Sequence, residues 1–340
     1  MPTRRGVLTI MALFGTGAAI AQEGDSRPIR LIVPFAVGGS TDLVARLLGA
    51  AASPVLGQSI IVDNRTGAGT ILGSSVVAKA SPDGNTLLFA TVAHAINPTL
   101  QAHMPYSQAD FTAVARVATV PLVLSIHPSV PANTLAEFLA YVRANPGEVK
   151  YGSAGIGSAL HMAGEVLKYQ AKLDVVHVPY RGAGPAMNDL MSGQVQFIID
   201  PISTSAQQIV AKNIRALAVT SERRSPSLPD VPTFHEAGMP DYEASTWNVV
   251  LAPKGTAASV VRRLNEAINR TMSDPALVDR LRELDVIPIS DSSPESTAAY
   301  IALETERWAV IIKSAGLKVD NRSDVEIPRD SERSSLGGSP

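Results

Sequence analysis

The chain has 340 residues, of which 45% are hydrophobic and 18% are charged, so it has enough apolar material for two ordinary domain cores. A formal net charge of −2, with no basic run, excludes the electrostatic footprint of a nucleic-acid-binding protein. The chain contains no cysteine, which excludes disulfides, thiol catalysis and thiolate metal sites.

Residues 1–21 have the composition of an export signal. Arg4 and Arg5 supply the positive start, residues 7–20 the apolar stretch, and Ala19-Ile20-Ala21 a small-x-small cleavage site. The apolar run is too short to span a bilayer, and no run of 18 apolar residues follows it. We therefore expect a soluble mature chain in the periplasm, exported by the general route or by the twin-arginine route that the paired arginines suggest.

Two stretches each predict a strand that leads through a loop of small residues into an amphipathic helix. In the first, residues 29–33 form the strand, Gly38 and Gly39 lie in the loop, and Ser40 or Thr41 starts the helix. In the second, Ser158 starts the helix, and the loop contains Gly152, Ser153, Ala154, Gly155 and Gly157. Glycines let the backbone approach a ligand, and the first N–H groups of a helix lack internal partners. Each loop therefore predicts a site for a small anion, and the pair suggests one ligand held from two sides.

The rest of the chain alternates between predicted strands and helices. The further strands are expected at residues 59–62, 86–91, 121–126, 175–178, 194–199, 214–219 and 247–251. Alternation of this kind indicates a parallel sheet with helices on its faces. The turn at residues 127–133 and the proline-rich segment at 221–233 predict two crossings between separate lobes. The polar, aperiodic residues 321–340 predict a flexible tail.

Eight motifs follow one another between Arg27 and Val319. They are VPFAVGGSTDLVAR, VDNRTGAGTILG, ASPDGNTLLFAT, INPTL, VKYGSAGIGSALHMAGE, VPYRGAGPAMNDLMSGQVQFIID, IRALAVTSERRSPSLPDVPT and LAPKGT. In this order they resemble the Bug family, the extracytoplasmic solute receptors of tripartite tricarboxylate transporters. The resemblance implies an α/β, two-lobed periplasmic-binding-protein fold of type II-like topology, with the ligand cleft between lobes joined by two crossings.

The resemblance also implies how the chain divides. Residues 27–126 and 222–320 are expected to form the first lobe, and residues 127–221 the second. The return of the C-terminal third to the first lobe rests on the resemblance alone. One departure is Thr70, where the family usually continues the Gly-Ala-Gly run with another glycine, so the role of residues 67–70 stays open.

In such receptors the two glycine-containing loops hold a carboxylate largely through backbone N–H groups. Carried over to this sequence, the implied ligand-binding residues are Phe35, Ala36, Gly38, Gly39, Ser40, Thr41 and Asp42 on the first lobe, and Ser153, Ala154, Gly155, Gly157 and Ser158 on the second. Neither loop contains a lysine or arginine. Four to six donors at roughly 1.5–3 kcal/mol each still suffice for the about 8 kcal/mol of micromolar binding.

The expected function is therefore a receptor, not an enzyme, that captures a small organic acid and delivers it to the membrane subunits of a tripartite carrier. No cofactor is implied, and a monomer is expected. Further ligand contacts are expected at strand ends, where open α/β sheets bind ligands. The candidates are Asn64, Thr91, His94, Tyr180, Arg181 to Gly184, and Asp200.

The nature of the solute stays open between monocarboxylates, dicarboxylates, amino acids and aromatic acids. Arg181 would favour a second carboxylate, whereas Asp200 would favour an amino group or serve only in packing. Within the binding class, a sensory receptor that hands its closed form to a signalling ectodomain is the alternative. From another class, an exported serine hydrolase would use Ser158 and His161, although no GxSxG elbow is present.

Two further interpretations are disfavoured. Residues 67–73 have a GxGxxxG spacing, but three residues separate them from the preceding strand and no acidic residue follows at the distance a dinucleotide site requires. The six histidines lack the HExxH or HxxxH spacing of a metal site.

Overall fold

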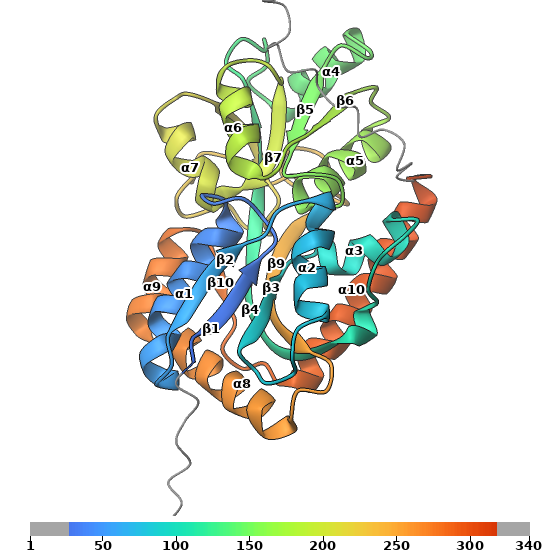
Figure 1. The fold of residues 1–340 in the computed structure, drawn as a ribbon. Helices are drawn as coiled ribbons and strands as arrows, with labels where there is room; N and C mark the ends of the chain where they lie inside the picture. Colours follow the sequence, from blue (N-terminus) through green and yellow to red (C-terminus); the bar gives the residue numbers. More distant parts are fainter. Residues whose placement is uncertain (1–26, 318–340) are drawn as a thin grey trace, which may run out of the picture.

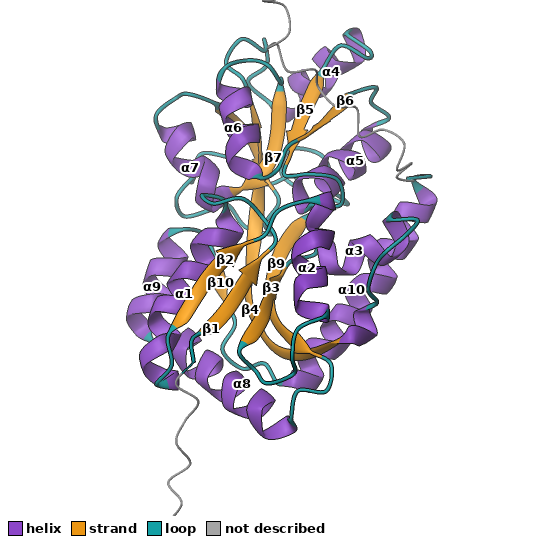
Figure 2. Cartoon of the chain, in the orientation of Figure 1, coloured by secondary structure: helices purple, strands orange, loops and turns teal. Residues whose placement is uncertain are grey.

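The computed structural model describes residues 27–317, so the expected export signal and the predicted tail at 321–340 lie outside the described residues. Within this range the chain forms a mixed α/β structure (Figures 1 and 2). Ten strands form one curled sheet in the order β2-β1-β3-β9-β4-β7-β5-β6, with β8 and β10 also paired to β4. The α/β prediction is confirmed.

The first half of the sheet contains three parallel strands, joined by antiparallel neighbours. The parallel strands are β1 (Ile29–Val33), β2 (Ile60–Asn64) and β3 (Thr86–Ala90). The antiparallel strands are β9 (Ser245–Pro253), which lies between β3 and β4, and the short β10 (Ile287–Pro288). We call this half of the sheet, with its helices, the first lobe.

Helices cover both faces of this half, because alternate strand residues are apolar on both sides. Ile29, Leu31 and Val33 pack on one side, whereas Ile32 packs on the other. The first side is covered by α1 (Ser40–Leu56), α8 (Ala258–Met272) and α9 (Pro275–Glu283). The second side is covered by α2 (Ile71–Ala78), α3 (Ala93–Leu100) and α10 (Pro294–Ser314).

The second half of the sheet contains three parallel strands that pair in the order β7-β5-β6, with β7 antiparallel to β4. They are β5 (Lys150–Ser153), β6 (Val176–Pro179) and β7 (Phe197–Pro201), and β8 (Arg215–Val219) pairs with β4. The helices here are α4 (Leu135–Ala144), α5 (Ala159–Ala171), α6 (Ala183–Met191) and α7 (Ile202–Val210). We call this half the second lobe; it forms the upper part of the molecule in Figure 1.

One long strand, β4 (Phe111–Ile126), belongs to both lobes. Its residues 111–121 pair with β9, and its residues 122–126 pair with β7 and β8. The chain therefore changes lobes inside β4, ahead of the predicted crossing at residues 127–133. The return passes through residues 220–244, between β8 and β9, where the sequence predicted the second crossing at 221–233. The lobe limits themselves stay predictions.

The predicted strand at residues 121–126 covers only the end of β4. Two register shifts against β9, between Ala113 and Ala115 and between Arg116 and Ala118, interrupt the regular pairing of its first part. A bulge places an extra residue in one strand and breaks the two-residue alternation by which a strand is recognised in a sequence. The first part of β4 was missed for this reason.

Candidate ligand-binding site

A cavity lies between the two lobes, where β1, β3, β5 and β7 lead into the following helices. Its empty space, open solvent included, is about 410 Å³. Its wall comes from both lobes: Phe35, Ala36, Gly39, Ser40, Thr41, Thr91 and Thr246 from the first, and Ala154, Ser158, Ala159, Leu160, Ala183 and Pro201 from the second. Both predicted loops thus contribute to one cavity.

Four helices begin at this cavity. The residues before α1, α6 and α7 are Gly39, Gly182 and Pro201, and none of them caps its helix with a side-chain hydrogen bond. At α5, Ser158 Oγ accepts a hydrogen bond from the His161 N–H at 3.3 Å. No wall residue carries a charged side chain. The polar groups at the site are therefore uncharged. Uncapped backbone N–H groups lie at the positive ends of helix dipoles, which favour an anion, and hydroxyl groups come from Ser40, Thr41, Thr91, Ser158 and Thr246.

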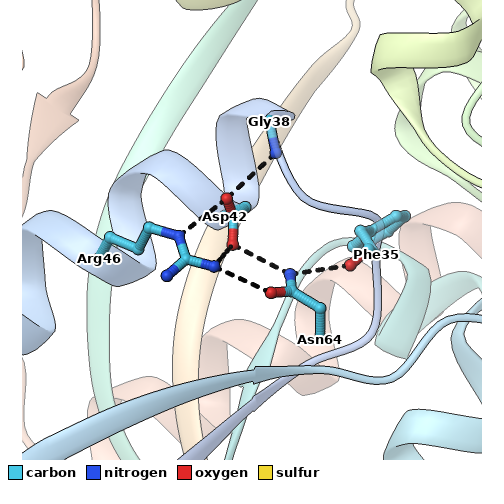
Figure 3. Close-up of polar contacts among 5 residues, drawn as sticks. All are labelled: Phe35, Gly38, Asp42, Arg46 and Asn64. Atoms are coloured by element: carbon cyan, nitrogen blue, oxygen red, sulfur yellow. Dashed lines mark hydrogen bonds and ion pairs between the residues drawn. The ribbon is translucent and has the colours of Figure 1, made fainter.

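The loop before α1 is held by Asp42, whose carboxylate is buried (Figure 3). This carboxylate accepts hydrogen bonds from the Gly38 N–H at 3.1 Å, Arg46 Nε at 3.0 Å and Asn64 Nδ2 at 3.0 Å. Asn64 also donates to the Phe35 carbonyl, so the end of β2 is tied to the loop. Burial raises the pKa of Asp42, but these hydrogen bonds and the Arg46 charge outweigh burial and lower that pKa.

Asp42 is therefore a structural residue that holds the loop before α1 in place; we call this role the brace of the loop. Its two oxygens already have partners, and the Arg46 guanidinium, 2.9 Å from Oδ1, balances its charge. Without this ion pair, a carboxylate in the first turn of α1 would repel an anionic ligand. The Gly38 N–H is likewise already used within the loop.

Three residues of the second loop that were predicted to bind the ligand, Ser153, Gly155 and Gly157, form hydrogen bonds within the protein instead. The Gly155 N–H donates to Ser153 Oγ at 3.1 Å, and the Gly157 N–H donates to His161 Nδ1 at 3.2 Å. Both glycines have positive φ, +114° and +80°, which a residue with a Cβ rarely adopts. None of these three predicted residues belongs to the cavity wall.

The structure does not bring Tyr180, Arg181 or Asp200 into the cavity wall. The Tyr180 hydroxyl donates to Asp189 at 2.6 Å, and Arg181 is exposed. Asp200 is fully buried, and its Oδ2 accepts hydrogen bonds from the hydroxyls of Thr204 and Ser205 at 2.5 and 3.0 Å. Asn64 and His94, the other strand-end candidates outside the wall, are used in the Asp42 network and in packing on Phe111. Thr91 does belong to the wall.

Asp200 should make the stability of the protein depend on pH. Burial raises its pKa to about 7, although the two hydroxyl donors act in the opposite direction. A carboxyl with a raised pKa contributes stability that is fully present below pH 3.8 and is lost as the pH rises through about 7. We expect Asp200→Asn to raise the free energy of unfolding by about 2–4 kcal/mol at pH 8 and by much less at pH 5. Urea unfolding at both pH values measures this, and an equal effect at both would contradict it.

The two lobes touch around the cavity. Ser203 Oγ, in α7, donates to Ser40 Oγ in α1 at 2.8 Å. A Cβ at Gly182 would lie 2.8 Å from Ala36 Cβ, and a Cβ at Gly69 would overlap the Ile156 carbonyl oxygen. Only glycine allows these backbones to approach so closely. The structure is therefore a closed arrangement of the lobes.

Residues 67–70, whose role the sequence left open, form a turn at the contact between the two lobes. Asn97 Nδ2, in α3, donates to the Gly69 carbonyl at 2.9 Å and to Thr70 Oγ1 at 3.1 Å. The turn is thus fixed from inside the first lobe and faces the Ile156 carbonyl of the second. Thr70 adopts φ +81°, in the region where glycine is usual, and its hydroxyl accepts the Asn97 bond.

Ser158 and His161 do not form a nucleophile and base pair. Ser158 Oγ accepts from the His161 backbone N–H, and the ring Nδ1 of His161 accepts from the Gly157 N–H. The hydrogen bonds of the ring therefore leave Ser158 Oγ without an imidazole acceptor. A nucleophilic serine needs such an acceptor within hydrogen-bond distance. Among residues 27–317, no three histidine, aspartate or glutamate side chains are grouped to hold a metal ion.

Four wall residues were not predicted: Ala159, Leu160, Pro201 and Thr246. Ala159 and Leu160 are the first two residues of α5, where helix N–H groups are unpaired, so extending the predicted loop past Ser158 would have found them. Pro201 ends β7 and precedes α7, the same strand-to-helix pattern as the two predicted loops. Thr246 comes from β9, far along the chain, and carries no signal in the sequence.

Comparison with known proteins agrees with this arrangement. A family model described as "Tripartite tricarboxylate transporter family receptor" matches residues 44–317. A protein from the tcbD-tcbE intergenic region of Pseudomonas sp. (strain P51) is 42% identical, covering 91% of this chain and 94% of its own. Protein BugT of Bordetella pertussis is 36% identical, covering 92% of this chain and 98% of its own.

Solved structures of similar proteins have the same two-lobed fold. The periplasmic binding protein BugD is 35% identical with a TM-score of 0.83, covering 86% of this chain and 99% of its own. The R. palustris protein Rpa4515 with adipate is 36% identical with a TM-score of 0.83, covering 87% and 99%. MatC from Rhodopseudomonas palustris with bound malate is 32% identical with a TM-score of 0.81, covering 85% and 99%. Within residues 27–317, no helix has the length and apolarity needed to cross a membrane.

Proposed function

The chain belongs to the tripartite tricarboxylate transporter receptor family, and on this premise we propose that it captures a small organic acid in the periplasm and presents it to the membrane subunits of a carrier. The observation that carries the proposal is the meeting of four helix starts, three of them uncapped by side chains, on one cavity with no charged wall residue. The carboxylates adipate and malate in the similar structures support the same ligand class.

The proposed mechanism is closure of the lobes on the ligand. Wall residues of α1 and α5 belong to different lobes, so a carboxylate can contact both helix starts only when the lobes are closed. A ligand that contacts the closed form alone shifts the equilibrium towards it. The closed form then offers the carrier one defined surface made of both lobes.

The ligand class is tested by calorimetry with matched acids and neutral analogues. We expect adipate or malate, or another small mono- or dicarboxylate from a thermal-shift screen, to bind with a dissociation constant near the micromolar range. The corresponding diamide should bind at least tenfold more weakly, because hydrogen bonds to a charged acceptor are roughly twice as strong as neutral ones. Equal affinity for an acid and its amide would contradict the proposal.

The proposal also makes the chain a receptor without catalytic activity. Ser158→Gly should keep most of the helix stability, because glycine replaces a serine cap at a cost of only a few tenths of a kcal/mol. If Ser158 were a nucleophile, turnover of p-nitrophenyl esters by the native chain would disappear in this variant. We expect no turnover in either protein, and turnover that depends on Ser158 would favour the hydrolase.

A further inference from the structure

We propose that His161 and His177 are positioning residues that hold the second-lobe loop, residues 153–158, in its ligand-binding shape. This inference rests on the proposed function, because it concerns how that site is kept in form. Neither histidine belongs to the cavity wall. Both lie behind the loop and contact its backbone, either directly or through Ser153.

The histidines are part of a column of rings on one face of the second lobe. Phe197, Tyr151 and His177 are register partners in the adjacent strands β7, β5 and β6. Their rings stack with centroid distances of 5.3 Å for Phe197 and Tyr151 and 4.8 Å for Tyr151 and His177. His161, from α5, adds a fourth ring 4.3 Å from His177. The column is fixed by the sheet, so the end that carries the histidines has a defined position.

Each histidine fixes one of the loop glycines. His161 Nδ1 accepts the Gly157 N–H at 3.2 Å. His177 Nε2 lies 2.6 Å from Ser153 Oγ, which accepts the Gly155 N–H. Both N–H groups are buried. Removing the His161 ring would therefore leave the Gly157 N–H without its acceptor, and removing the His177 ring would leave Ser153 Oγ without its hydrogen-bond partner. The loop between these two anchors contributes Ala154 and Ser158 to the cavity wall.

The hydrogen bond to His161 and the burial of both rings favour the neutral imidazoles. Nδ1 of His161 can accept a hydrogen bond only without a proton, so its neutral form carries the proton on Nε2. Burial lowers the pKa of His161 to about 4 and the pKa of His177 to about 2. The other ionisable groups acting on the pair are Glu165, whose carboxylate accepts from the Tyr151 hydroxyl at 2.6 Å, and Lys168. Neutral imidazoles add no charge behind the anion site.

Three variants test the role of His161. His161→Leu removes the acceptor and should weaken carboxylate binding at least tenfold, about 1.4 kcal/mol. His161→Asn places an amide oxygen where Nδ1 stood and should bind within about threefold of the native chain. Val166→Ala, on the same helix and outside the loop, is the matched packing control. It should lower the unfolding midpoint in urea and leave calorimetric affinity for the best acid of the screen unchanged.

Two results would overturn the inference: affinity within about twofold of native in His161→Leu, or an asparagine variant that binds no better than the leucine variant. If the leucine variant does not fold, imidazole ¹⁵N NMR of the ligand-free native chain at pH 7 decides, with Nδ1 of His161 expected to be unprotonated and a protonated Nδ1 contradicting it. This spectrum needs no ligand. A native chain that binds no carboxylate but shows the expected tautomer would therefore refute the proposed function separately.

Discussion

Gly39→Val is expected to weaken carboxylate binding more than a hundredfold, about 2.8 kcal/mol, while the protein stays folded. Gly39 lies in the cavity wall directly before α1, and a Cβ there would stand 3.8 Å from Ala183 Cβ of the other lobe. The two methyl groups of valine would extend beyond that contact, into the space over the α1 N–H groups or between the closing lobes. Either position removes the contacts that favour the closed, liganded form.

The backbone at Gly39 permits this experiment. Its φ of −82° is ordinary for any residue, so the substitution adds no strain, and loss of a favourable cap residue costs about 1 kcal/mol. Gly39→Ala is the matched control, because its Cβ makes an ordinary contact with Ala183. Alanine should bind within about threefold of the native chain by calorimetry. Native affinity in the valine variant would rule out this cavity as the site.

Gly155→Val would be a less informative change than Gly39→Val. Its φ of +114° makes any side chain strained, and a Cβ would lie 3.2 Å from the Tyr180 carbonyl oxygen. Loss of binding there would report distortion of the loop. Gly39 combines an ordinary φ with a place in the wall, so it separates ligand contact from loop shape.

Asp42→Ala is expected to lower the free energy of unfolding by about 2–4 kcal/mol and to weaken ligand binding at least tenfold. The change removes the acceptor of the Gly38 N–H and of Asn64 Nδ2, and it leaves Arg46 without its partner. Arg46 is half-exposed and can turn to solvent, which keeps the cost below that of a fully buried pair. The loop that carries Phe35 to Gly39 then loses its brace.

Asp63→Ala provides the matched control for this prediction. Asp63 is next to Asn64 and pairs with Arg30 and Arg65, but its side chain is partly exposed. Surface ion pairs contribute about 0–1 kcal/mol, so we expect little loss of stability and unchanged affinity. Urea unfolding and calorimetry on both variants separate the role of Asp42 in holding the loop from that of Asp63 in a surface ion pair. Equal effects in the two variants would contradict the role proposed for Asp42.

Asp42 should also affect how the stability of the protein changes in acid. The pKa of Asp42 is lowered in the folded protein, so its contribution is present above its ordinary pKa of 3.8 and is lost as the pH falls below that value. The acid side of the stability profile should therefore be shallower in Asp42→Ala than in the native chain. Asp200 acts in the opposite direction, between pH 3.8 and about 7.

The sequence alone predicted the alternation of strands and helices and the two strand-to-helix loops. It did so because these features depend on neighbouring residues: small residues at a turn, a cap at a helix start, and apolar side chains at helical spacing. Gly39, Ser40, Thr41 and Ser158 were placed in the site by this local pattern and do lie in the cavity wall. The eight motifs likewise sufficed to indicate the family to which the chain belongs.

Only the tertiary structure decided which of the loop N–H groups are left to bind a ligand. Gly38, Gly155 and Gly157 have the same local signature as Gly39, but their N–H groups are taken by Asp42, Ser153 and His161. Ser153 is in turn bonded to His177 on the neighbouring strand, and Thr246 reaches the wall from β9. A helix start is encoded by residues next to one another in the sequence. Whether its N–H groups are already hydrogen-bonded depends instead on the packing of strands and helices that lie far apart in the chain.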